Sequence, residues 1–194
     1  MNLEPLKVQE ARRWYSAEIN TSSAPLVNSV AKRLVDAKAR YQGVETRTGV
    51  PWPIIAVAHE REASQSWQAQ LSQGDPWNKV SIHVPRGRGP FKSWDDAAVD
   101  ALVNCSPFLS RWTDWRIGGA LVALEAYNGF GYYNRGVPSP YIWAMTNQYR
   151  RGKYVADGHY DPMAIDRQIG CAALLLSMGS IDPSIDQLFE GFTR

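Results

Sequence analysis

Residues 52–64 have the sequence Trp-Pro-Ile-Ile-Ala-Val-Ala-His-Glu-Arg-Glu-Ala-Ser, and the expected fold class follows from this stretch. The stretch opens an apolar segment with helical spacing that ends before a Gly-Asp-Pro turn, so we expect a helix over residues 54–71. On a helical wheel of about 100° per residue, Glu62 lies within about 40° of Ile55, whereas Glu60 points to the opposite side. The pattern therefore places Glu62 on a mostly apolar helix face.

Helical apolar spacing recurs along most of the chain and predicts a mainly α protein. The sequence Ser-Trp-Asp-Asp at residues 93–96 has the form of a capping box, which predicts a helix from there to about Asn104. Prolines and glycines surround the alternating residues 80–84, so we expect a loop with a short strand or β-hairpin over residues 74–92. Further helices are expected over residues 6–19, 26–41, 117–127, 141–149, 165–178 and 183–189.

The length of 194 residues is suited to one domain with a single active site. We expect residues 1–45 to form a helical N-terminal extension that packs on a catalytic domain of residues 46–194. The two cysteines, Cys105 and Cys171, lack the neighbours of a metal-binding or redox motif, and we expect both to be buried free thiols. The sequence contains no internal repeat or long linker that would indicate a further module.

The charge balance and the apolar pattern argue against a nucleic-acid-binding protein, a signal peptide and a membrane span. Lys and Arg total 21 against 19 for Asp and Glu, and so small an excess does not indicate a nucleic-acid-binding protein. The N-terminal residues lack the features of a signal peptide, and no stretch approaches the roughly 20 apolar residues of a membrane span. We therefore expect a protein that is made in the cytoplasm without a signal peptide and has no membrane span.

Glu62 is the candidate catalytic residue, because a carboxyl group on an apolar face loses hydration and its pKa rises. Such a group can protonate a glycosidic oxygen, and a second carboxylate then activates water or stabilises the positive sugar ring. Asp75 is the nearest candidate for that second group, and Ser81, Asp95 and Asp114 remain open as alternatives. Alternatively, Glu62 is a buried acid that forms an ion pair with Arg61, Arg86 or Arg88.

The histidines do not form a recognisable metal-binding motif. A zinc peptidase helix would need a second histidine four residues after His59, and that position is Ala63. His83 and His159, the other two histidines, have no cysteine close by in sequence. Neither the Gly-x-Ser-x-Gly motif of ester hydrolases nor a phosphate-binding Gly-Lys-Ser/Thr loop is present. We expect no metal or organic cofactor.

Two stretches resemble a known enzyme family. Residues 52–64 are similar to the catalytic helix of goose-type lysozymes and lytic transglycosylases, and Ala-Tyr-Asn-Gly-Phe-Gly-Tyr at 126–132 is similar to their glycan-cleft motif. Over residues 50–178 the chain most resembles phage and prophage endolysins. The resemblance implies a mostly helical, two-lobed lysozyme-like fold with a small loop or β-hairpin lobe. It also implies Glu62 as general acid, Asp75 as a possible base, and Tyr127 and Asn128 in the substrate cleft.

The resulting prediction is a muramidase-type endolysin that cleaves peptidoglycan glycan strands. We expect a monomer that is made in the host bacterial cytoplasm without a signal peptide and reaches the cell wall after release through a holin-type pore. Ala63 replaces the usual Ser of the motif, and the Gly-Leu-Met-Gln segment of transglycosylases is missing, which favours hydrolysis over transglycosylation. A lytic transglycosylase, a chitinase-like enzyme and a non-enzymatic wall-binding or virion protein remain alternatives. Polar and aromatic side chains bind sugars by hydrogen bonding and stacking. The candidate substrate-contacting residues are His59, Trp77, Ser81, His83, Tyr127, Asn128, Tyr132 and Tyr141.

Overall fold

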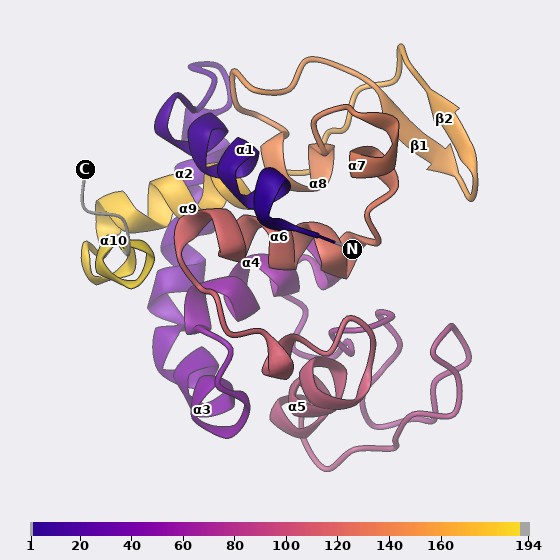
Figure 1. Cartoon of the computed structure of the whole chain (residues 1–194). Helices are drawn as coiled ribbons and strands as arrows, with labels where there is room; N and C mark the ends of the chain where they lie inside the picture. The colour runs from indigo at the N-terminus through magenta and orange to yellow at the C-terminus, as the bar shows by residue number, and fades with distance from the viewer. Residues whose placement is uncertain (1, 191–194) are drawn as a thin grey trace. The chain divides into compact units, whose positions relative to one another are not determined.

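A computed structural model describes residues 2–190, and helices dominate it (Figure 1). The described residues contain ten α-helices, one short 3-10 helix and one two-stranded antiparallel sheet, which confirms the prediction of a mainly α protein. The chain divides into two compact units, Asp36–Thr113 and a second unit of Met1–Val35 with Asp114–Arg194. The boundaries between the units fall at residues 35/36 and 113/114, and the first two helices share a unit with the C-terminal part of the chain.

The unit Asp36–Thr113 is built around three helices. Helix α3 packs against both α4 and α5. Two ion pairs of 2.9 Å, Arg40–Asp95 and Arg47–Asp96, join α3 to the first turn of α5. The arginines thus meet acidic side chains where the positive end of the α5 dipole favours negative charge. The helical elements of this unit are α3 (Lys38–Thr48), α4 (Trp52–Ala63), α5 (Trp94–Asn104) and the 3-10 helix η1 (Leu109–Arg111).

The start of α5 confirms the predicted cap. The Ser93 hydroxyl oxygen accepts a hydrogen bond of 3.1 Å from the Asp96 amide, which satisfies one of the free N–H groups in the first turn. The Asp96 carboxylate pairs with Arg47 of α3. The local sequence signal therefore also connects the helix to its neighbour in the unit.

The predicted strand at residues 80–84 is wrong, because this segment is irregular. Its apolar side chains Val80, Ile82 and Val84 are exposed, so the alternation has no core to face. The Ile82 amide donates to the Asp75 carboxylate, and the Ser81 amide donates to the Arg88 carbonyl. Hydrogen bonds within the loop thus take the place of a strand ladder.

The second unit contains the remaining helices and the sheet. Helix α6 is buried from Ile117 to Ala126, and α9 is almost as completely buried, as expected for helices that are apolar all round. Helix α1 packs on α6, where a Cβ at Gly118 would overlap the Lys7 carbonyl oxygen. The elements are α1 (Glu4–Tyr15), α2 (Ala24–Asp36), α6 (Ile117–Asn128), α7 (Gly131–Arg135), α8 (Pro140–Trp143), β1 (Lys153–Ala156), β2 (His159–Asp161), α9 (Cys171–Ile181) and α10 (Ser184–Phe189).

Strands β1 and β2 form a hairpin that the sequence analysis did not predict (Figure 1). Asp157 and Gly158 make the turn, and Gly158 has a φ of 68°, as such tight turns require. Helix α8 is shorter than predicted because Ala144 has a ψ of 143°, an extended conformation that ends the helix at Trp143. Helix α9 begins at Cys171, six residues later than expected, because residues 165–170 are irregular.

Both cysteines are buried free thiols, as expected from their apolar neighbours. Burial raises the pKa of the Cys105 thiol, which keeps it in the unreactive protonated form. Within residues 2–190, no helix has both the length and the apolar character needed for a bilayer crossing.

Candidate active site

Helix α4 places Glu62 in its last turn. The helix ends at Ala63 and does not continue to residue 71 as predicted, because Ser64 and Gln65 adopt left-handed φ values of 48° and 59°. Their amides bond back to the Glu60 and His59 carbonyls at 2.9 and 3.3 Å, which closes the helix end. The Glu62 side chain is half-buried. It therefore sits at a closed helix terminus in a partly desolvated position.

The His59 ring anchors this helix end from inside the unit. His59 is fully buried, with Nδ1 2.9 Å from the Tyr41 hydroxyl and Nε2 3.1 Å from the Ser66 carbonyl oxygen. A carbonyl oxygen only accepts, so Nε2 carries the hydrogen and Nδ1 accepts from Tyr41. Burial lowers the pKa of His59 to about 4, which keeps this neutral tautomer.

Because both ring nitrogens are used inside the protein, the prediction that His59 contacts substrate is replaced by a positioning role. It ties the turn that follows Glu62 to helix α3. Aromatic rings surround the imidazole, with the Trp94 and Trp67 centroids at 4.5 and 4.7 Å. The Arg40 guanidinium lies 4.1 Å from the Trp67 ring centroid, which adds a cation–π contact to the cluster.

The loop after α4 folds back onto the end of that helix. The Gln70 amide donates to the Asp75 carbonyl at 2.7 Å, and the Gly74 amide donates to the Gln70 carbonyl at 3.0 Å. A Cβ added at Gly74 would lie 4.0 Å from the Glu62 carbonyl oxygen. This close approach brings the segment that begins Gly74-Asp75 beside the turn that carries Glu62.

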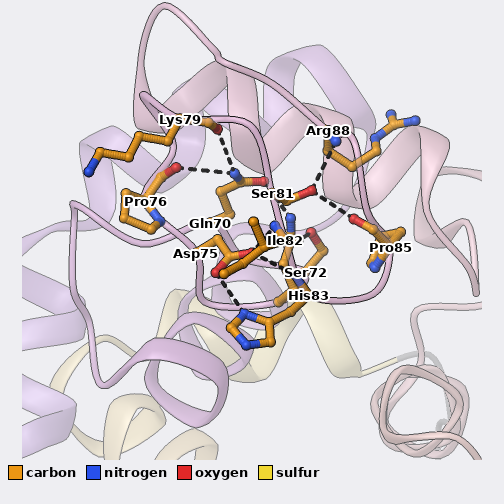
Figure 2. A network of polar contacts seen from close by, with 11 residues as sticks. Gln70, Ser72, Asp75, Pro76, Lys79, Ser81, Ile82, His83, Pro85 and Arg88 are labelled. Carbon is orange, nitrogen blue, oxygen red and sulfur yellow. Dashed lines mark hydrogen bonds and ion pairs between the residues drawn. The ribbon is translucent and has the colours of Figure 1, made fainter.

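Asp75 holds the segment of this loop around residues 82 and 83 through hydrogen bonds (Figure 2). Its Oδ2 accepts the amides of Ile82 and His83 at 2.8 and 3.0 Å, and its Oδ1 accepts from His83 Nδ1 at 2.7 Å. The amide of His83 is the main cause that lowers the pKa of Asp75, followed by the imidazole. These hydrogen bonds keep Asp75 ionised although the residue is only 7% exposed, and both carboxylate oxygens are engaged.

Ser81 performs a similar structural task. Its hydroxyl donates to the Pro85 carbonyl and accepts from the Arg88 amide, both at 2.9 Å, and the side chain is buried (Figure 2). Arg88 in turn forms an ion pair with Asp100 of α5. The prediction that Ser81 contacts substrate is therefore corrected, because the hydroxyl already has a donor and an acceptor in its own loop.

Two of the predicted substrate-contacting residues in this loop, Trp77 and His83, remain accessible to solvent. The Trp77 ring is half-buried, and its Nε1 donates to the Trp67 carbonyl at 2.9 Å. The His83 side chain is 69% exposed although its Nδ1 is fixed by Asp75. Within the unit Asp36–Thr113, Glu62 thus lies at the end of α4, and Asp75 and His83 lie in the loop that folds back onto that end (residues 74–83, the return loop).

The other four predicted residues belong to the second unit. Asn128 is exposed and Tyr127 half-buried at the end of α6, so both keep some accessible surface. Tyr132 is buried, and its hydroxyl accepts from the Tyr154 amide of β1 at 3.1 Å. Tyr141 is 4% exposed in α8. The predicted substrate contacts of Tyr132 and Tyr141 are therefore corrected to core positions.

A pair of buried acids in the second unit was missed. Glu125 is 4% exposed in α6, and Glu10 is 8% exposed in α1. Both line a cavity of about 30 Å³ together with Ser139. Burial is the main cause that raises the pKa of Glu125 to about 7, and it also raises the pKa of Glu10, whose Oε2 accepts from Trp143 Nε1 at 2.6 Å. The sequence signal for a buried acid was Glu125 itself, a single glutamate in the otherwise apolar run 117–126.

No group of three or more potential metal ligands forms among residues 2–190. Comparison of the chain with protein-family models, with curated proteins and with solved structures gave no match. Any functional conclusion therefore depends on the chemistry of the residues themselves and on the resemblance of two sequence stretches.

Proposed function

We propose that this protein is a peptidoglycan-degrading glycosidase, a muramidase with a lysozyme-like two-lobed fold and Glu62 as its general acid. The observation that carries the proposal is the position of Glu62 in the closed last turn of α4, with the Gly74–His83 loop folded back beside it. The resemblance of residues 52–64 to the catalytic helix of goose-type lysozymes supports the same assignment.

The location of Glu62 suits proton donation. The glycosidic oxygen is a poor leaving group until it is protonated, so the enzyme needs a carboxyl group that still holds its proton when substrate binds. Glu62 lies in the last turn of α4 and is half-buried, so the side chain keeps accessible surface where a substrate could meet it. The internal hydrogen bonds of His59 hold this turn in place, which preserves the geometry of proton transfer.

The resemblance separately supports a glycan-binding role for the accessible residues at the end of α6 in the second unit. Asn128 offers an amide for hydrogen bonds to sugar hydroxyls, and the half-buried Tyr127 offers a ring for stacking. The similarity of residues 126–132 to the glycan-cleft motif of lytic transglycosylases is the reason for the assignment. The expected product is a glycan fragment with a reducing end, because water is the proposed nucleophile.

The test is release of fragments from purified peptidoglycan by the wild-type protein and by Glu62→Gln. Loss of the proton donor is expected to reduce turnover by a factor of about 10² to 10⁴. Glu4→Gln is a matched control, since that side chain is 67% exposed in the other unit. Thermal melting confirms that each variant is folded.

Mass spectrometry of the fragments distinguishes the possible reactions. Reducing ends support hydrolysis, whereas 1,6-anhydro ends indicate a lytic transglycosylase with the same acid. Equal activity of wild type and Glu62→Gln refutes the catalytic assignment. Binding to the cell wall without fragment release by either protein supports a non-enzymatic role and refutes the glycosidase proposal.

A further inference from the structure

His83 is the group of the return loop that has a reactive atom available to solvent. Its ring projects from the hydrogen-bonded network of residues 70–88 (Figure 2), and the side chain is 69% exposed. Its side chain contacts Asp75, through Nδ1 at 2.7 Å. Among the described residues, Nε2 therefore has no protein partner.

The Asp75 contact determines which ring nitrogen is basic. An ionised carboxylate only accepts hydrogen bonds, so His83 Nδ1 carries a hydrogen, and in the neutral imidazole the lone pair is on Nε2. The two amide bonds from Ile82 and His83 fix the carboxylate, and the carboxylate in turn fixes the ring. The loop thus presents an oriented imidazole with a free acceptor nitrogen, an arrangement that serves as a general base in many enzymes.

Asp75 itself is poorly suited to accept a proton from water. It is 7% exposed, and it already accepts three hydrogen bonds through its two oxygens. Removal of any of these bonds would release the loop that Asp75 holds. A water molecule can reach His83 Nε2 without such a rearrangement.

We propose that His83 is the general base of the reaction and that Asp75 is its positioning residue. This inference rests on the proposed glycosidase function with Glu62 as the acid. The loop that carries the pair begins at Gly74, where an added Cβ would lie 4.0 Å from the Glu62 carbonyl oxygen. The proposed second catalytic group is therefore an imidazole rather than the predicted carboxylate.

In the proposed step, the water oxygen forms a bond with the anomeric carbon while the bond from that carbon to the glycosidic oxygen breaks. One water proton moves to His83 Nε2, and the Glu62 proton moves to the leaving oxygen. The His83 proton then returns through solvent to the Glu62 carboxylate, so both groups regain their starting states. Direct attack by water inverts the configuration at the anomeric carbon.

The experiment measures kcat and KM on soluble peptidoglycan fragments for wild type, His83→Gln, His83→Ala and Asp75→Asn. His159→Gln is the matched control, because His159 is an exposed histidine of β2 in the other unit. We expect His83→Gln to lower kcat by a factor of about 10² to 10⁴ with KM nearly unchanged. Added imidazole should restore part of the activity of His83→Ala and none of that of Glu62→Gln. Proton NMR of the first product should show the inverted anomer.

The outcomes separate the inference from the proposed function. Wild-type activity that is lost in Glu62→Gln but retained in His83→Gln refutes the role of His83 alone. Retained anomeric configuration also refutes it, because retention requires a covalent nucleophile. A wild-type protein that releases no fragments refutes the proposed function, and the assignment of His83 falls with it. Rescue of folded His83→Ala by imidazole supports a chemical role, since a purely structural defect would not respond.

Discussion

Replacement of Glu125 by Gln is expected to change how stability depends on pH. Glu125 is 4% exposed, and its pKa is raised from an ordinary value of 4.5 to about 7, mainly by burial. Below pH 4.5 the carboxyl is protonated in both the folded and the unfolded chain, so burial of a charge costs nothing. As the pH rises, the unfolded chain ionises first and the folded state loses relative stability until the pH passes about 7.

The size of the effect follows from the same values. One pKa unit corresponds to about 1.4 kcal/mol, so the difference between 4.5 and about 7 corresponds to roughly 3 kcal/mol. Glutamine has nearly the same shape and does not ionise. Its carbonyl oxygen can accept the Tyr133 amide in place of Glu125 Oε1, which now lies 3.4 Å away. At pH 8, Glu125→Gln should therefore be more stable than wild type by up to about 3 kcal/mol.

The assay is urea denaturation of wild type and Glu125→Gln at pH 4.5, 6 and 8, followed by circular dichroism. The free energies of unfolding should nearly coincide at pH 4.5 and diverge as the pH rises. Asp157→Asn in the exposed hairpin turn is the control, and its difference from wild type should stay constant. A parallel pH dependence in wild type and Glu125→Gln would refute the claim that this buried carboxyl titrates near neutrality.

Four further substitutions test the packing within each of the two units. Ser93→Ala removes the helix cap and should lower the free energy of unfolding by about 1 kcal/mol; an unchanged urea midpoint would contradict the role of the cap. His59→Ala leaves a cavity and two unsatisfied polar groups, so thermal melting should show a loss of roughly 2–4 kcal/mol, and stability within 1 kcal/mol of wild type would argue against the anchoring role. Gly118→Ala should lower the free energy of unfolding by about 1–3 kcal/mol, because the added Cβ meets the Lys7 carbonyl. Gly43→Ala in α3 has open space around the added Cβ and should raise the free energy of unfolding by about 0.5–1 kcal/mol. Equal effects of the two substitutions would refute this packing argument.

The helical character of the protein could be predicted because local signals agree with the final packing. The Ser93 cap and the continuous apolar run of α6 each specify a helix within a few residues of sequence. The region 74–92 was correctly expected to contain a loop, since prolines and glycines interrupt any regular pattern. The position of Glu62 on a helix also followed directly from the period of its apolar neighbours.

The roles of individual polar residues could not be predicted in the same way. Ser81 and His59 have donors and acceptors that suit a substrate, but the fold satisfies both internally. The alternation at residues 80–84 resembles a strand, yet no partner strand reaches it, and Asp75 takes two of its amides. Hydrogen bonds between polar groups of a loop follow no periodic pattern in the sequence, so the sequence could not predict them.

By itself, the sequence determined that the chain forms apolar helices with α4 carrying Glu62, because helix formation depends on contacts between residues three or four apart. Only the tertiary structure decided that α4 stops at Ala63, that Asp75 is held by its own loop, and that His83 is left with a free nitrogen. It also decided that Glu125 and Glu10 share a buried cavity. Desolvation and hydrogen-bond satisfaction depend on which distant segments surround a group, and these neighbours exist only after the chain has folded.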